Sequence, residues 1–300
     1  MPAMRDRIVI DWGTSNFRAY RFGPGGMVID RHQAPAGILT VRDGDFEAVL
    51  RREIGRWMTP EREIFLSGMI TSRNGWVETP YLECPATLAG IAAKAQRRKL
   101  SDGVRLNFMP GVSTLAPSPD VMRGEEMQVF GVVAENSTAT IVLPGTHSKW
   151  VRVVDGAITG LRTFMTGELF ALLGQHSIVG RLMPKTPAPF DEAAFLAGVD
   201  RAFGAESISL LNDIFTARSG ALLGAFPVES IASRLSGMLI GHELAAGLAE
   251  AGQGSPRLVI VGDTALVDRY SKALAHRGQA AEIGPADAAV AGFRKLATPA

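Results

Sequence analysis

Apolar and polar positions follow the same layout in two stretches of this chain. In residues 7–33, three short runs rich in β-branched and aromatic side chains are separated by turns at glycine, and residues 138–164 repeat that order. Short runs of this kind, bounded by glycine turns, predict strands that pair with their neighbours in sequence. The chain is therefore expected to contain two three-stranded meanders.

The segments that follow each meander alternate between helical and strand patterns. In residues 45–58, Phe46, Val49 and Leu50 recur at helical spacing and define one apolar face. The other expected elements are strands at 64–66, 104–109, 258–261 and 281–283, helices at 88–100, 266–274 and 286–296, and a loop that opens a helix at 123–131. A mainly helical stretch at 168–252 is expected to begin with a cap at Thr166. This order favours two α/β lobes over one doubly wound sheet.

A segment rich in proline, glycine and serine, residues 110–119, is the best candidate for a linker between the lobes. We therefore expect an N-terminal lobe of residues 1–117 and a C-terminal lobe of residues 118–300.

Composition and charge exclude several classes of protein. The 300 residues are 46% apolar and carry a net charge of +1, so no basic excess points to nucleic acid or to a membrane surface. The single cysteine, Cys84, rules out an internal disulfide and fits a reducing compartment. No apolar run reaches the roughly 18 residues of a membrane helix, and residues 1–6 lack the apolar stretch of a signal peptide. We expect a cytoplasmic protein that binds neither nucleic acid nor membrane.

Each meander turns at a Gly-Thr pair, and such a turn suits a phosphate group. The turn residues are Gly13, Thr14 and Ser15 in the first meander and Gly145 and Thr146 in the second. Glycine lets the backbone approach a ligand, and the turn N–H groups and the Thr hydroxyl can donate to phosphate oxygens. Asp11, at the end of the preceding strand, is a candidate to hold a hydrated Mg²⁺. One such turn alone is more typical of an ordinary hairpin, and its repetition favours a nucleotide clamped between two lobes.

An acidic pair, Glu125 and Glu126, follows Gly124 shortly before the second meander. Phosphoryl transfer to a hydroxyl uses a carboxylate that accepts the hydroxyl proton, and a glycine lets such a group project from a tight turn. The alternative is that both glutamates stabilise the first turn of a helix through its dipole. The neighbouring phosphate turn favours the catalytic role.

A polar loop at residues 72–76 carries candidate substrate contacts. It contains Arg73 and Asn74, which suit an anionic or hydroxylated ligand. An exposed loop with a surface arginine fits the same pattern equally well. Both interpretations stay open at this point.

Two further segments carry candidate ligand-binding residues. His147 and Lys149 flank the second turn, where His147 is either a base or a hydrogen-bonded turn residue and Lys149 can neutralise phosphate or carboxylate. Gly262 and Asp263 end a buried strand and open a helix, a place where a nucleotide can rest. The alternative for that segment is a plain strand–turn–helix unit. The chain has no P-loop sequence and no histidine or cysteine at metal-ligand spacing.

Together these segments resemble the sugar-kinase, actin and Hsp70 superfamily of two-lobed ATP-binding proteins. The matching segments are Asp11–Arg18 for the first phosphate motif, Leu143–Trp150 for the second, Val259–Leu266 for the adenosine motif and Ala288–Leu296 for the second connecting helix. The resemblance implies a ribonuclease H-like (actin-like ATPase) α/β fold, with ATP and Mg²⁺ bound in a cleft between the lobes. It also implies that the last helix, at about 286–297, returns to the hinge.

A closer resemblance is to the 2-dehydro-3-deoxygalactonokinase family. Its distinctive segments are similar to Asp11–Ser15, Leu143–Trp150 and Phe164–Phe170 of this chain. The resemblance implies ATP-dependent phosphorylation of 2-dehydro-3-deoxy-D-galactonate on its 6-hydroxyl in galactonate catabolism. Larger carbohydrate kinases carry Gly-Asp where this chain has Gly-Glu, which makes Glu125 the expected base and leaves Glu126 and Asp11 as rivals.

The implied substrate is a small sugar acid, whose carboxylate needs a cationic partner. Arg18, Arg73 and Lys149 are alternatives for that partner. The other expected substrate contacts are Trp12, Asn74 and His147. The competing functions are a kinase of another sugar acid or of a neutral sugar, a sugar-responsive regulator, and an actin- or chaperone-like ATPase, whose long insertions do not fit in 300 residues. A homodimer stays open.

Overall fold

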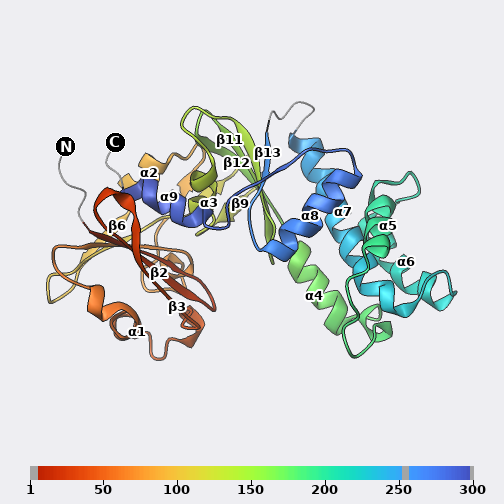
Figure 1. The fold of residues 1–300 in the computed structure, drawn as a ribbon, viewed down its shortest axis with the longest axis horizontal. Helices are drawn as coiled ribbons and strands as arrows, with labels where there is room; N and C mark the ends of the chain where they lie inside the picture. The colour runs from red at the N-terminus through yellow and green to blue at the C-terminus, as the bar shows by residue number, and fades with distance from the viewer. Residues whose placement is uncertain (1–5, 252–256, 298–300) are drawn as a thin grey trace. The chain divides into compact units, whose positions relative to one another are not determined.

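The computed structural model describes residues 6–251 and 257–297, which form two compact units (Figure 1). The first unit comprises Met1–Thr138, Val153–Leu161 and Asp287–Ala300, and the second comprises Ala139–Arg152 and Arg162–Ala286. This division differs from the single expected boundary after residue 117, because the chain passes from one unit to the other four times.

A six-stranded sheet in the order β3-β2-β1-β4-β7-β6 is the frame of the first unit. Its strands are β1 (Arg7–Trp12), β2 (Phe17–Phe22), β3 (Val28–Ala34), β4 (Glu63–Ser67), β6 (Gln96–Lys99) and β7 (Arg105–Phe108). Antiparallel pairing of β1 with β2 and of β2 with β3 confirms the first predicted meander. Because β1 and β4 pair parallel, their carboxyl ends meet at the same edge of the sheet.

Side chains on one face of this sheet form the apolar core of the first unit. Ile8 and Ile10 of β1 and Ile64 and Leu66 of β4 are fully buried and belong to one cluster with the buried face of α1 (Phe46–Ile54). These strand residues alternate with Val9, Asp11 and Ser67, which therefore belong to the opposite face. The helix predicted at 45–58 is confirmed, since α1 is followed by a 3₁₀ turn at Gly55–Trp57.

Helices α3 (Glu126–Val132) and α9 (Ala288–Ala297) pack against each other within the first unit. A Cβ at Gly131 would lie 1.8 Å from the carbonyl oxygen of Ala288, and a Cβ at Gly292 would lie 1.9 Å from that of Met127. Only glycine lets two backbones come this close. The last helix is confirmed, and it lies along the element that begins at the acidic pair.

The helix predicted at 88–100 is wrong in its second half. Helix α2 (Leu88–Ala93) ends early, and Gln96–Lys99 form β6 at the edge of the sheet, paired antiparallel with β7. The four side chains of β6 are exposed, so this segment has no apolar face that could decide its structure. Charged side chains on an edge strand also discourage pairing with another chain.

The linker predicted at 110–119 is an ordered part of the first unit. It contains β8 (Val112–Thr114), which forms a small sheet with β5 (Leu82–Glu83) and β9 (Asp120–Met122). The proline and glycine residues of this segment therefore shape turns inside one unit and mark no boundary.

A second sheet has five strands in the order β12-β11-β10-β13-β14, and the part of it within Val153–Leu161 is counted with the first unit. Its strands are β10 (Ala139–Leu143), β11 (Ser148–Val154), β12 (Ala157–Phe164), β13 (Leu258–Ile260) and β14 (Glu282–Ile283). The second predicted meander, β10 to β12, is confirmed, and β10, β13 and β14 pair parallel as β1, β4 and β7 do. The two sheets therefore repeat one topology.

The described helices of the second unit are α4 (Thr166–His176), α5 (Glu192–Phe203), α6 (Leu210–Leu222), α7 (Ile231–Ala251) and α8 (Thr264–His276). They confirm the helical stretch predicted at 168–252, whose last residue lies outside the described part. The predicted cap at Thr166 is wrong: Met165 occupies the cap position, and the Thr166 hydroxyl donates to Glu243. Among the described residues, no helix combines the length and apolar character needed to cross a bilayer.

Candidate active site

The carboxyl ends of β1 and β4 and the start of α3 meet at one point of the first unit. A Cβ at Gly68, which follows β4, would lie 3.1 Å from Asp11 Oδ1 on β1. A Cβ at Gly124, which precedes α3, would lie 3.2 Å from the Gly68 Cα. Gly124 also has a φ of +104°, which L side chains rarely adopt. This turn brings Glu125 and Glu126 to the edge of the sheet where Asp11 lies.

Glu126 is fully buried and holds this turn together. Its Oε1 accepts a hydrogen bond from Ser67 Oγ at 3.0 Å, and its Oε2 accepts one from the Gly124 N–H at 2.7 Å. Burial, and to a lesser degree the charge of Glu125, raise the pKa of Glu126 to about 8. The side chain is therefore mostly protonated at neutral pH.

Glu125 differs from its neighbour because its side chain is only half-buried. Its Oε2 accepts a hydrogen bond from the Arg123 N–H at 2.9 Å, which fixes the carboxylate beside the turn. The charge of Glu125 raises the pKa of both Asp11 and Glu126, so it lies close to both groups. The environment thus separates Glu125, the expected base, from its rival Glu126.

Asp11 pairs with Arg18 across the hairpin formed by β1 and β2, with Arg18 Nη1 3.2 Å from Asp11 Oδ2. Burial raises the pKa of Asp11, Arg18 opposes the shift, and the charge of Glu125 adds to it. The described residues contain no group of three or more His, Cys, Asp or Glu side chains that could hold a metal. A single carboxylate with 30% of its side-chain surface exposed fits Mg²⁺, which keeps several waters and takes only one or two carboxylates.

Hydrogen bonds from residues 37–39 fix the backbone of the first Gly-Thr turn, and the turn itself is exposed. The N–H groups of Gly37, Ile38 and Leu39 donate to the carbonyl oxygens of Ser15, Gly13 and Thr14, respectively. Within residues 6–251 and 257–297, the N–H groups of Thr14 and Ser15 make no hydrogen bond, and both residues are exposed. The turn therefore presents free donors on a fixed backbone, as an anion site requires.

Arg123, which the sequence analysis did not single out, ties the loop after β4 to the turn before α3. Its Nη1 donates to Thr71 Oγ1 and Thr79 Oγ1, each at 2.7 Å, and its Nη2 donates to the Thr79 carbonyl at 3.0 Å. Its guanidinium also lies over the Tyr81 ring, 4.3 Å from the centroid. The feature of the sequence that could have indicated this role is a cationic residue directly before a Gly-Glu turn.

The predicted substrate residues of the first unit have different surroundings. Arg73 and Asn74 are exposed, and the Arg73 Nε lies 3.5 Å from Glu78 Oε1 on the surface. Trp12 is fully buried, and its Nε1 donates to the Ala36 carbonyl at 2.8 Å. A side chain with no exposed surface offers nothing to a substrate. The structure therefore places Trp12 in the core, where its apolar area stabilises the unit.

The second Gly-Thr turn is supported by the first turn of α4. The Thr146 carbonyl accepts a hydrogen bond from the Glu168 N–H at 3.0 Å, and His147 Nε2 hydrogen-bonds to the Glu168 carboxylate. Lys149 is buried, and its Nζ donates to the His147 carbonyl at 3.2 Å. In the described part of the chain, the N–H groups of Gly145 and Thr146 make no hydrogen bond. His147 and Lys149 thus stabilise the turn, and its backbone N–H groups remain available to a ligand.

A buried carboxylate behind this turn, Glu243 on α7, also escaped the sequence analysis. Its Oε1 accepts hydrogen bonds from Ser148 Oγ at 2.6 Å and Trp150 Nε1 at 2.9 Å. Its Oε2 accepts one from the Tyr270 hydroxyl at 2.6 Å and one from the Thr166 hydroxyl. These four donors lie on β11, α4 and α8. The sequence signal was a lone acid in an apolar stretch of a long helix.

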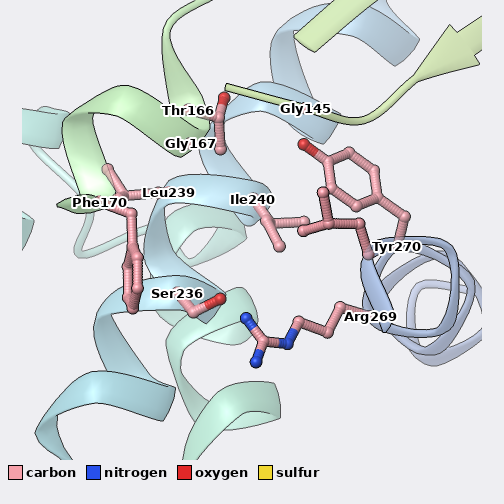
Figure 2. A pocket seen from close by; sticks show the side chains of 10 residues that line it. Gly145, Thr166, Gly167, Phe170, Ser236, Leu239, Ile240, Arg269 and Tyr270 are labelled. Atoms are coloured by element: carbon pink, nitrogen blue, oxygen red, sulfur yellow. The ribbon is translucent and has the colours of Figure 1, made fainter. Parts of the chain in front are cut away.

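A pocket beside this network lies within the second unit and is shown in Figure 2. Gly145 and Gly167 lie at one side, Ile240 of α7 lines the wall, and Arg269 of α8 points toward Ser236. Asp263 caps α8 by accepting a hydrogen bond from the Ala265 N–H at 2.9 Å. The predicted Gly262-Asp263 segment therefore opens the helix that lines this pocket.

The sequence matches the family described as 2-keto-3-deoxy-galactonokinase over residues 11–296. A curated protein of Rhizobium meliloti (strain 1021), named as a 2-dehydro-3-deoxygalactonokinase, is 35% identical over 288 residues, 94% of this chain and 92% of that protein. The 2-dehydro-3-deoxygalactonokinase of Escherichia coli (strain K12) is 33% identical over 292 residues, 97% of each chain.

Solved structures show the same likeness. The crystal structure of a Sinorhizobium meliloti protein assigned as a 2-dehydro-3-deoxygalactonokinase has a TM-score of 0.88 at 33% identity and covers 97% of each chain. A Porphyromonas gingivalis structure assigned as an N-acetylglucosamine kinase has a TM-score of 0.51 at 12% identity, covers 96% of this chain and 97% of that one, and is similar in fold alone. The predicted α/β fold of sugar kinases and actin-like ATPases is confirmed.

Proposed function

Because the chain belongs to the 2-keto-3-deoxy-galactonokinase family, we propose that it transfers the γ-phosphate of ATP to the 6-hydroxyl of 2-dehydro-3-deoxy-D-galactonate. The match over residues 11–296 to a family of that activity carries the proposal. The carboxylates where β1 meets α3 offer the chemistry that the reaction needs. The cytoplasmic location, the homodimer and the lack of nucleic-acid and membrane partners remain predictions from the sequence.

Glu125 is the proposed base that accepts the proton of the attacking hydroxyl. Its carboxylate is partly accessible, and the Arg123 N–H holds it in one position. Glu126 is fully buried and engaged by Ser67 and Gly124, which suits a positioning residue. Asp11 is engaged by Arg18, which leaves its carboxylate less free to meet the attacking hydroxyl.

The free N–H groups of the two Gly-Thr turns are the proposed donors to the phosphate oxygens of ATP. Asp11 is the proposed anchor of Mg²⁺ through water, because it is a partly exposed oxygen donor next to the first turn. When bound, Mg²⁺ neutralises charge on the phosphoryl group that is transferred. The pocket lined by α7 and α8 is the proposed place of the adenosine, which brings Gly262 and Asp263 close to the nucleotide.

Arg73 is the proposed partner of the substrate carboxylate, with Asn74 beside it. The guanidinium of Arg73 is exposed, and its ion pair with Glu78 is long and solvent-exposed. By contrast, Arg18 is engaged by Asp11, and Lys149 donates to the carbonyl of His147. Both of these cations are therefore assigned to holding the hairpins, as is His147 through Glu168.

A substrate panel tests the proposal. We expect ADP release in the presence of ATP, Mg²⁺ and 2-dehydro-3-deoxy-D-galactonate, with a lower kcat/KM for its C4 epimer and almost none for neutral sugars. Because an exposed arginine that loses a carboxylate partner mainly affects binding, Arg73→Ala should raise the KM for the sugar acid and leave the KM for ATP unchanged. The matched control is Arg52→Ala, a similarly exposed arginine on α1.

Two results of that panel would contradict the proposal. Saturable activity confined to neutral sugars would reject the sugar-acid substrate. Equal effects of Arg73→Ala and Arg52→Ala on the KM for the sugar acid would reject Arg73 as the carboxylate partner.

A further inference from the structure

Helix α6 in the second unit is apolar on both of its faces. Asp213 and Ala217 are buried, and Leu210 and Ile214 pack against the neighbouring apolar cluster. The outward side carries large apolar side chains as well: Leu211 is 82% exposed, Phe215 51% and Leu222 58%. A helix on a protein surface ordinarily presents polar side chains to water. Helix α6 packs on α7, as Figure 1 shows. The apolar side chains on its outer face are therefore not covered by the described part of the chain.

Further apolar side chains extend this face into one patch. Ile208 precedes α6 and Leu223 follows it, and both are exposed. Ile178 adjoins the centre of the helix, because Arg218 Nη1 donates to the Ile178 carbonyl at 2.6 Å. We call these residues the α6 patch: Ile178, Ile208, Leu211, Phe215, Leu222 and Leu223. A contiguous apolar surface of this kind marks an interaction site.

The residues along the patch have a symmetric spacing. Leu211, Phe215, Arg218 and Leu222 follow one another at separations of 4, 3 and 4 residues. These are the separations at which the side chains of one helix face a second helix. The order of separations is the same when the helix is read in the opposite direction. These four residues, which we call the α6 stripe, can therefore face the same four residues of an antiparallel copy.

We propose that α6 packs antiparallel against α6 of a second copy of this chain. A two-fold axis between residues 216 and 217 places Leu211 opposite Leu222 of the partner subunit, and Phe215 opposite Arg218 of the partner subunit. A guanidinium over an aromatic ring is a favourable contact, and the axis creates it twice. The same residues serve both subunits, as a two-fold interface requires.

The charge and size of the patch favour a second copy over other occupants. Arg218 is the one charged side chain on the stripe, which is too little basic charge for an anionic lipid surface or nucleic acid. A standard interface covers about 800 Å² per partner, with an apolar centre and a polar rim. Six large apolar side chains, five of them more than half exposed, supply such a centre.

The mass in solution tests the proposal without reference to the kinase activity. We expect a particle of twice the 32.0 kDa of the chain by sedimentation equilibrium. Phe215→Lys should give a monomer with unchanged kcat, because it replaces the ring with a cation that faces Arg218 of the partner subunit, and like charges repel across an interface. Met27→Lys, at an exposed apolar position of the first unit, should leave the mass unchanged. If Phe215→Lys does not fold, Leu211→Gln serves as the milder variant.

Cysteine cross-linking tests the register in a Cys84→Ser background. Leu211→Cys alone and Leu222→Cys alone should not form a disulfide-linked dimer, whereas the double variant should form one on oxidation. Cross-linking of a single variant would place the axis elsewhere and overturn the register.

Three outcomes would overturn the interface itself. The first is a wild-type monomer at every concentration, and the second is a dimer that survives Phe215→Lys. The third is a monomer whose α6 patch binds vesicles of anionic lipid, which would assign the patch to a membrane surface.

Discussion

At the scale of single residues, the start of α3 gives two adjacent glutamates opposite surroundings. Glu126 is buried between Ser67 and the Gly124 N–H, whereas Glu125 is half-buried and accepts a hydrogen bond from the Arg123 N–H. A base must exchange its proton with a substrate, so accessibility favours Glu125. The buried neighbour keeps the turn in shape.

Glu125→Gln tests this assignment. The substitution keeps the size of the side chain and removes its basicity, so we expect kcat to fall by at least about a hundredfold, the low end for a general base. The KM for ATP should stay nearly constant, because the Gly-Thr turns are unchanged. Steady-state kinetics measures both values. A larger loss of kcat in Glu126→Gln than in Glu125→Gln would reverse the assignment.

The ionisation of Glu126 predicts how stability depends on pH. Its pKa is raised to about 8 in the folded chain, against 4.5 for an ordinary glutamate, so the folded state holds the proton more tightly. The stabilisation from this proton is fully present below about pH 4.5 and is lost as the pH rises through about 8. Glu126→Gln cannot ionise, so its free energy of unfolding should fall less steeply over this range.

Urea unfolding at about pH 5, 6.5 and 8 measures both slopes. Parallel slopes for the wild type and for Glu126→Gln would attribute the pH dependence to other groups.

At the scale of elements, Glu243 joins the strand and helices that surround the second Gly-Thr turn. It accepts hydrogen bonds from Ser148, Trp150, Thr166 and Tyr270. Hydrogen bonds to a buried charge are strong, and removing the acceptor leaves every donor unsatisfied. The network therefore fixes where β11 and α4 lie beneath the turn.

Glu243→Ala should lower the free energy of unfolding by about 3–5 kcal/mol, as expected when one partner of a buried charged network is removed. Tyr270→Phe removes a single donor and should cost about 1 kcal/mol. Because the turn rests on this network, the KM for ATP should rise more in Glu243→Ala than in Tyr270→Phe. Equal losses in both variants would mean that Glu243 does not join the four donors.

The elements that can be predicted from the sequence are those that a local pattern of residues determines. Both meanders, α1 and α9 follow from glycine turns and apolar spacing, which act over a few residues. Strand β6 cannot be predicted in this way, because its four exposed polar residues become a strand only by pairing with β7. The sequence also predicts where the acidic pair and the turns lie, but not that Trp12 is a core residue or that Arg123 and Glu243 hold the site. Those roles depend on partners far away along the chain.

At the scale of the whole molecule, the last helix belongs to the same unit as the N-terminal residues. Residues 287–300 count with residues 1–138, and α9 packs against α3. Val290 and Phe293 of α9 are buried. The expected boundary after residue 117 placed this helix in the C-terminal lobe, although the family resemblance implied its return to the hinge, because the contact joins residues more than 150 positions apart.

Phe293→Ala should therefore destabilise the first unit by about 3–5 kcal/mol, the cost of removing a fully buried ring. Fluorescence reports mainly this unit, since Trp12 and Trp57 belong to its core cluster and Trp76 packs against it, whereas the second unit contains Trp150 alone. Met27→Ala, at an exposed position of the same unit, should change the value by less than about 0.5 kcal/mol. An effect of Phe293→Ala no larger than that of Met27→Ala would place α9 outside the fold of the first unit.

The packing of α9 on α3 also has a consequence for synthesis on the ribosome. Residues 6–138 leave the ribosome early, but their unit is complete only when residues 287–297 have emerged and covered α3. Folding of the first unit must therefore wait for the end of the chain, and α3, which follows the proposed base Glu125, stays uncovered until then. Folding of the nascent chain should accordingly be completed late, and the acidic pair should reach its final environment only after translation has passed the last helix.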